Sequence, residues 1–158
     1  MLVNGRQGRS ICKTVNKLLA RNALNFELTP EQRELRDTAR AFAREQMAPV
    51  AREMERTSEP LSKEWKRRYA EMGFLGINIS PEYGGLGLGN LEAIIVLEEF
   101  AKVHPGVAFP IFESAVGPIK AVEKFGTESL KRQLLPKVTS GEAVVAVAMS
   151  EPSAGSAL

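Results

Sequence analysis

Residues 141–156 read GEAVVAVAMSEPSAGS, and this stretch decides how the whole chain is interpreted. Ala143 to Met149 are consecutive apolar residues, and valine recurs among them. A short β-branched run between turn-forming residues predicts a strand that is buried on both faces. The residues that follow are small, polar and able to turn. A buried strand that ends in such a turn often brings main-chain N–H groups and hydroxyls to a bound cofactor.

A buried strand needs a neighbour, because its backbone donors and acceptors must be paired. The only other strand-like segment is short, Leu75 to Ile79, and the remaining sequence has helical periodicity. We therefore expect the apolar run to be the first strand of a β domain that lies largely beyond this chain. The predicted organisation is a basic leader at 1–25, a helical domain at 26–140, and the start of a truncated β domain at 141–158.

The helical domain is predicted from caps that precede apolar faces at helical spacing. Thr29-Pro30-Glu31-Gln32 forms a capping box with proline at the first helical position. Pro49 is expected to interrupt the first helix, since proline removes a backbone donor. Such signals predict an all-α antiparallel bundle of about six to seven helices that leads into the strand. The later helices are expected to begin near Val50, Ser62, Asn90, Val107, Pro118 and Thr127, the last ending at Pro136.

Composition excludes several classes of protein. The chain is 44% hydrophobic and 25% charged, which is ordinary for a globular protein, and it has no apolar run long enough to cross a membrane. It has one cysteine, Cys12, and one histidine, His104. No disulfide framework, metal cluster or histidine-based catalytic triad is therefore expected.

Charge is distributed unevenly. Residues 1–25 hold five basic residues and no acidic one, which leaves 16 basic and 19 acidic residues from Phe26 onward. The helical body is slightly acidic, so nucleic-acid binding is not expected. Two interpretations of the basic, amphipathic start remain open. It is either a mitochondrial transit peptide, which would place the protein in the matrix, or a disordered tail on a bacterial cytoplasmic protein.

A glycine-rich loop, Ser80-Pro-Glu-Tyr-Gly-Gly-Leu-Gly-Leu-Gly89, joins two predicted helices. Its spacing matches neither a Walker loop nor a dinucleotide-binding fingerprint. We expect a structural loop, in which glycines adopt positive φ or allow close packing.

The segment AMSEPSAGS at 148–156 resembles the signature of the acyl-CoA dehydrogenase family. Further segments agree with the same family in consistent order, and the resemblance covers Phe26 to Leu158. These segments are PEYGGLG at 81–87, LEEFA at 97–101, FGTE at 125–128 and the pair Leu135-Pro136.

The resemblance implies three parts: an N-terminal helical domain, a middle β domain and a C-terminal four-helix bundle. Members of the family remove two hydrogens from an acyl-CoA thioester. A glutamate takes the α proton, and the β hydrogen leaves as hydride to FAD. Electrons then pass to an electron-transfer flavoprotein, and the family suggests a homotetramer. The glutamate base belongs to the C-terminal part, so no catalytic residue is expected here and the fragment alone is expected to be inactive.

The resemblance also implies roles for particular residues. Val147, Met149, Ser150, Gly155 and Ser156 would contact FAD, and Ser156 would also reach the thioester substrate. Phe109 and Phe112 would shape the acyl-chain pocket, although two phenylalanines in a bundle are more often plain core.

One departure from the family concerns Ala157, which stands where the family usually has aspartate. This leaves the role of the neighbouring Ser156 open. Two alternatives to the dehydrogenase also remain: an acyl-CoA oxidase, which passes electrons to oxygen, and a non-catalytic helical module from a truncated gene.

Overall fold

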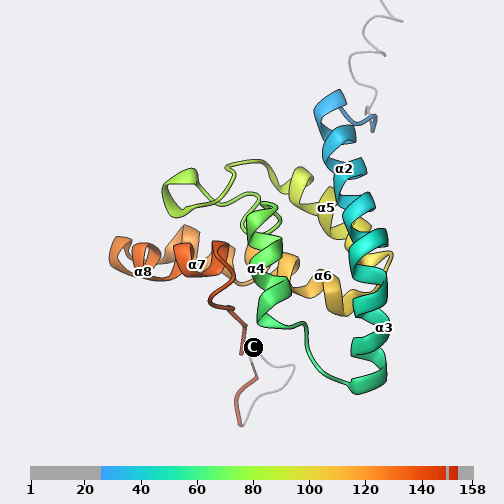
Figure 1. Ribbon diagram of the computed structural model, residues 1–158. Coiled ribbons are helices and arrows are strands. Elements are labelled where there is room, and N and C mark those ends of the chain that lie inside the picture. Colours follow the sequence, from blue (N-terminus) through green and yellow to red (C-terminus); the bar gives the residue numbers. More distant parts are fainter. Residues whose placement is uncertain (1–25, 149, 153–158) are drawn as a thin grey trace, which may run out of the picture.

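The computed structural model describes residues 26–148 and 150–152 (Figure 1). This part of the chain is helical, as expected. Its α-helices are α2 (Pro30–Phe42), α3 (Ala48–Thr57), α4 (Lys63–Glu71), α5 (Asn90–Ala101), α6 (Pro105–Ile111), α7 (Ile119–Phe125) and α8 (Glu128–Thr139). The shorter elements are π-helical segments at Ala43–Met47 and Phe112–Val116 and a 3₁₀ turn at Pro81–Tyr83.

The helix starts follow the predicted caps. The Thr29 hydroxyl accepts a hydrogen bond from the Gln32 amide, and the Gln32 side chain accepts one from the Thr29 amide, so the capping box is complete. Ser62 and Thr127 cap α4 and α8 through their hydroxyls alone, which accept hydrogen bonds from the Trp65 and Leu130 amides.

Contrary to expectation, Pro49 does not break the helical path: α2, a π-helical segment and α3 follow one another from Pro30 to Thr57, and α3 begins at Ala48 rather than near Val50. Proline is tolerated there because it lies in the first turn of α3.

The main core lies between α2, α4, α5 and α6 and is built around four aromatic rings. Phe42, Tyr69, Phe74 and Phe100 pack with centroids 5.1–6.4 Å apart, mostly edge to face. Edge-to-face packing suits the ring quadrupoles and adds to the gain from apolar burial. The buried Tyr69 hydroxyl donates to the carbonyl of Val107 at 3.0 Å, which ties α4 to α6.

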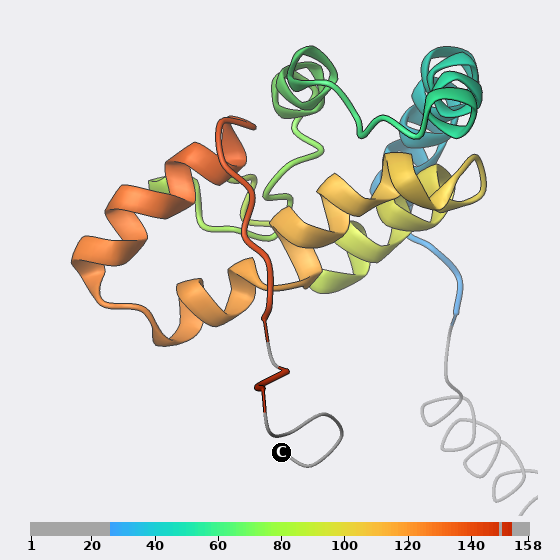
Figure 2. The same ribbon diagram turned by 90° about the horizontal axis from the view of Figure 1, so that it is seen from below.

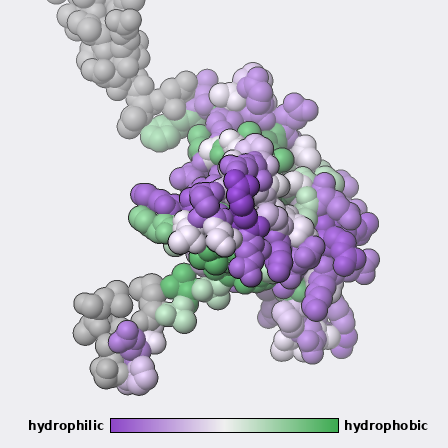
Figure 3. Space-filling model, turned by 90° about the vertical axis from the view of Figure 1, so that its left-hand side faces the viewer, coloured by the Kyte–Doolittle hydropathy of each residue, from purple (hydrophilic) through white to green (hydrophobic). Residues whose placement is uncertain are grey.

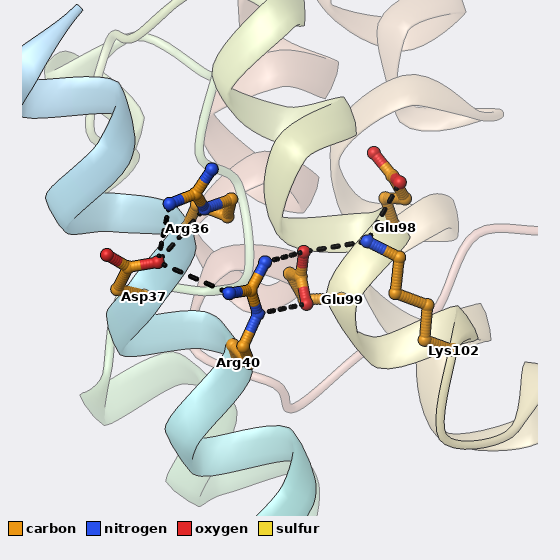
Figure 4. A network of polar contacts seen from close by, with 6 residues as sticks. All are labelled: Arg36, Asp37, Arg40, Glu98, Glu99 and Lys102. Carbon is orange, nitrogen blue, oxygen red and sulfur yellow. Dashed lines mark hydrogen bonds and ion pairs between the residues drawn. The ribbon is translucent and has the colours of Figure 1, made fainter. Parts of the chain in front are cut away.

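A partly buried ion-pair network joins α2 to α5 (Figure 4). The Glu99 carboxylate, only 3% exposed, accepts two hydrogen bonds from the Arg40 guanidinium at 3.0 and 3.1 Å and one from Lys102 at 2.8 Å. Glu98 is exposed and pairs with Lys102 alone among the described residues. Glu99 therefore has a structural role, and the two adjacent glutamates form no acid–base pair.

A second, smaller core lies where α7 and α8 meet the loop after α4. It contains Ile79, Tyr83, Ile119, Leu135 and Val138. Views from the front and from below place α7 and α8 on the opposite side of α4 from α2 and α3 (Figures 1 and 2).

The strand predicted at Ala143 to Met149 is not formed at 143–148, and Met149 lies outside the described residues. Ala143 and Val145 are half-buried against the second core, whereas Val144 and Ala146 are exposed. This alternation of half-buried and exposed side chains is typical of an extended segment. In the described part of the chain, however, no neighbouring strand forms hydrogen bonds with it. The one sheet-type pairing in residues 26–148 and 150–152 is an isolated bridge at Glu151.

Leu75 to Ile79 was also expected to be strand-like, and this expectation is wrong. The segment forms turns, because Gly73 and Gly76 adopt positive φ values of 74° and 68° on either side of Leu75. Its apolar side chains are nevertheless buried: Leu75, Ile77 and Ile79 are at most 4% exposed. Burial accounts for the apolar run without requiring a strand.

Two other helix boundaries differ from the sequence-based predictions. Helix α8 does not end at Pro136 but continues to Thr139, with Pro136 inside it. Helix α6 begins at Pro105 rather than near Val107, because the His104 ring accepts a hydrogen bond from the Gly106 amide at 3.0 Å and caps the helix. Proline suits the first position of that helix, where its missing donor costs nothing.

Candidate functional site

A hollow of about 500 Å³ lies between α6, α7 and the extended segment that follows α8. Helix α6 and the π-helical segment after it supply one side, and α7 supplies another. The extended segment closes the third side. The lining residues are Phe109, Phe112, Glu113, Gly117, Pro118, Ala121, Ala146 and Val147.

Phe109 and Phe112 are exposed, so they are not plain core residues. Their side chains are 57% and 40% exposed, and their rings meet edge to face with centroids 5.9 Å apart. Both also line a second, wholly apolar hollow of about 280 Å³ with Leu97, Ala101 and Ala108. Contiguous exposed apolar surface of this kind marks a place where another molecule or another part of a protein binds.

Phe109 lies in α6, and Phe112 begins the π-helical turn that follows it. The Gly117 amide donates to the Phe112 carbonyl at 2.7 Å, which is a bond across five residues. A Cβ at Gly117 would lie 2.9 Å from that carbonyl oxygen, so glycine permits the close approach. Single π-helical turns within helices occur frequently at functional sites.

Glu113 is the one ionisable residue among those that line the larger hollow. It is half-buried, and burial raises the pKa of its carboxyl, while the positive charge of Lys66 opposes that rise. The sequence analysis did not single out Glu113. Its spacing of four residues from Phe109, about one helical turn, was the signal that could have found it.

The structure places the predicted site residues as follows. Val147 is 59% exposed and lines the same hollow as Phe109 and Phe112, so these three come together. Ser150 is exposed a few residues further along the chain and lines none of the described hollows. Met149, Gly155 and Ser156 lie outside the described residues.

Apolar surface also continues along the extended segment that follows α8. The side view in Figure 3 shows apolar atoms running from the helical body toward the grey chain end at the lower left. Val144 and Val147 of that segment are 47% and 59% exposed. The segment therefore exposes apolar side chains in the described part of the chain.

The glycine-rich loop at 80–89 is structural, as expected. Its amides bond within the protein: Gly87 donates to the Ile79 carbonyl at 2.8 Å, and Leu88 donates to the Ile77 carbonyl at 2.9 Å. A Cβ at Gly85 would lie 2.2 Å from the Ile79 carbonyl oxygen. Amides that already have partners do not form a phosphate cradle.

Neither a metal cluster nor a membrane-spanning helix is found in the described residues. No three His, Cys, Asp or Glu side chains gather there in a way that could hold an ion. None of the described helices is long and apolar enough to cross a bilayer.

Comparison with known proteins identifies the domain. The family model for the acyl-CoA dehydrogenase N-terminal domain matches residues 29–142. The chain belongs to the acyl-CoA dehydrogenase family. The matched region holds every helix described above, and the extended segment that lines the hollow begins where the match ends.

Individual relatives of the family agree with this result. The chain is 40% identical over 131 residues to mitochondrial isovaleryl-CoA dehydrogenase of Pongo abelii, covering 82% of this chain and 31% of that protein. A glutaryl-CoA dehydrogenase solved with glutaryl-CoA superposes with a TM-score of 0.77 at 31% identity, covering 84% of this chain and 34% of that one. An acyl-CoA dehydrogenase from Bacillus anthracis solved with FAD superposes with a TM-score of 0.71 at 27% identity, covering 82% and 22%. The chain thus spans about a third of the length of the curated acyl-CoA dehydrogenases that it matches.

Proposed function

We propose that this chain is the N-terminal part of an FAD-dependent acyl-CoA dehydrogenase, which oxidises acyl-CoA thioesters between the α and β carbons. The observation that carries the proposal is the hollow where Phe109, Phe112 and Val147 meet, in a domain of this family. Two exposed aromatic rings and an exposed valine around a hollow of about 500 Å³ suit the hydrocarbon part of an acyl group.

The chain's own contribution to binding the acyl group is apolar burial. A hydrocarbon chain laid against Phe109 and Phe112 would remove exposed apolar surface from water, at about 25 cal/mol for each Å². Exclusion of water also protects the reacting carbons from side reactions. Phe109 and Phe112 are in this proposal substrate-binding residues that influence chain-length preference.

The segment that follows α8 would contribute to flavin binding. Its proposed flavin contacts are Val147, Met149, Ser150, Gly155 and Ser156. The exposed Ser150 fits this role, since its hydroxyl and amide lie just beyond the apolar segment that edges the hollow. Donors at such a position stabilise negative charge that arrives on an isoalloxazine ring. FAD, when bound, supplies the hydride acceptor. Ser156 would contact the thioester or the flavin phosphates. The next residue is Ala157, so the carboxylate that the family usually has at this position is missing.

We further propose that residues 1–158 alone do not catalyse the reaction. A base in the position described for the family would come from its C-terminal bundle. A dye-reduction assay with acyl-CoA and added FAD tests this, and turnover by these residues alone would refute it. The whole protein is proposed to pass electrons to an electron-transfer flavoprotein and to form a homotetramer, in the mitochondrial matrix or the bacterial cytoplasm.

The decisive experiment compares electron acceptors with the full-length protein. Reduction of an electron-transfer flavoprotein with little oxygen uptake supports the dehydrogenase. Rapid oxygen uptake would instead support an acyl-CoA oxidase. Absence of both flavin and acyl-CoA binding would support a non-catalytic helical module.

A further inference from the structure

Among the described residues, Glu113 is the one charged residue in the otherwise apolar lining of the proposed acyl site. The other residues that line the hollow are apolar or glycine, from Phe109 and Phe112 to Ala146 and Val147. A carboxylate in such a wall loses hydration, which is unfavourable unless an ion pair or hydrogen bonds compensate for it. The rise in the pKa of the Glu113 carboxyl through burial reflects that loss.

The charge of Glu113 is not cancelled by a direct partner. Lys66 is the basic group whose field reaches it, but no ion pair within 4 Å joins Glu113 to any basic side chain in the described residues. Lys66 and Glu113 instead both line a small neighbouring pocket, together with Leu75 and Val138, and Lys66 does not line the larger hollow. The hollow therefore contains one negative charge and no positive charge among its described lining residues.

We infer that Glu113 is a specificity-determining residue, which excludes acyl groups that end in a carboxylate and leaves the hollow to neutral hydrocarbon groups. The inference rests on the proposed function, because it requires that the acyl group enters this hollow. A second carboxylate in the hollow would face Glu113 without an intervening cation, and like charges in a site of low dielectric repel strongly. A neutral alkyl group has no such cost and still gains from contact with Phe109 and Phe112.

The discrimination matters because carboxylate-ended acyl groups occur within the family. The glutaryl-CoA dehydrogenase that superposes on this chain was solved with glutaryl-CoA, which has such a terminus. A single charged residue at the wall could separate the two substrate classes without any change of fold.

The test uses the full-length protein loaded with FAD, with butyryl-CoA and glutaryl-CoA as substrates. We expect Glu113→Gln to raise kcat/KM for glutaryl-CoA relative to butyryl-CoA by about tenfold or more, mainly through KM, because a repulsion in the bound state is removed. Glu113→Asp retains the charge and should retain the discrimination. Glu64→Gln is the matched control, since this exposed glutamate of α4 lies outside the hollow and its loss changes the net charge equally.

A binding measurement separates specificity from a folding defect. Titration calorimetry with unreactive thioether analogues of the two CoA esters should show the same change in the ratio of Kd values. An unchanged ratio in both assays would overturn the inference and leave the proposed function standing. Absence of turnover with every acyl-CoA tested would overturn the proposed function and the inference together.

Discussion

Replacing Glu99 with glutamine tests the link between α2 and α5 most sharply. The Glu99 side chain is 2% exposed and accepts charge-assisted hydrogen bonds from Arg40 and Lys102, which lie on different helices (Figure 4). Glutamine keeps the shape of the side chain but removes its charge. Charge-assisted bonds are about twice as strong as neutral ones, so the substitution should destabilise the protein.

The contribution of the Glu99 carboxylate to the free energy of unfolding follows from its pKa. The hydrogen bonds from Arg40 act against the effect of burial and lower this pKa from 4.5 to about 2. At about 1.4 kcal/mol for each pH unit, the ionised carboxylate stabilises the fold by about 3 kcal/mol near neutral pH. Because the pKa is lower in the folded protein, this contribution is complete above pH 4.5. It is lost as the pH falls toward 2, with about 2 kcal/mol gone at pH 3.

Urea unfolding at a series of pH values measures the contribution of Glu99 to the free energy of unfolding. Glu99→Gln should lower the free energy of unfolding near pH 7 by about 2 to 3 kcal/mol, and its difference from the wild type should narrow below pH 4.5. Glu53→Gln, which breaks an exposed pair with Arg56, is the matched control and should have little effect. A Glu99→Gln variant as stable as the wild type at pH 7, or a gap that stays constant in acid, would refute the reasoning.

Other substitutions test the glycine loop, the aromatic core and the acyl site. Gly85→Ala should unfold or strongly destabilise the protein, by about 2 kcal/mol or more in urea unfolding, because its Cβ would lie 2.2 Å from a backbone carbonyl oxygen. Gly89→Ala meets only a flexible carboxylate and should be much milder, so equal losses would contradict this account. Tyr69→Phe should lower the free energy of unfolding by about 1 kcal/mol, because it removes the buried hydrogen bond from the Tyr69 hydroxyl to the Val107 carbonyl, and an unchanged chemical denaturation midpoint would argue against that bond. Phe109→Ala and Phe112→Ala should leave the melting temperature nearly unchanged, since both rings are exposed, yet raise KM for acyl-CoA in the full-length protein; a large fall in melting temperature with normal kinetics would place them in the core instead.

The helices could be predicted from the sequence because their signals are local. Thr29 and Ser62 cap helices through hydroxyls that reach amides three residues ahead, and such spacing is visible in the sequence. The two segments predicted to be strands do not form strands in the described part of the chain. Leu75 to Ile79 is apolar because its side chains reach the core, while positive-φ glycines turn its backbone. Ala143 to Met149 needs a neighbouring strand, and that is a property of the tertiary structure rather than of the segment.

The site was only partly predictable for a related reason. The sequence indicated Phe109, Phe112 and Val147, and folding brings these three to one hollow. Glu113 lies one helical turn from Phe109, but that spacing alone does not show that it borders a hollow, and Ala121 has no such signal. Both reach the hollow only because α7 packs beside the π-helical turn. The spacing of residues within one helix predicts which of them share a face of that helix. Which other element that face contacts depends on the tertiary packing.

Whether the full-length protein binds flavin and transfers electrons to it from acyl-CoA can be followed in one spectroscopic measurement. The full-length protein is mixed with butyryl-CoA without oxygen while its visible absorbance is recorded. We expect a yellow protein whose flavin absorbance band bleaches within the dead time or shortly after mixing. A colourless protein that takes up no added FAD, or a flavin band that no acyl-CoA bleaches, would contradict this expectation.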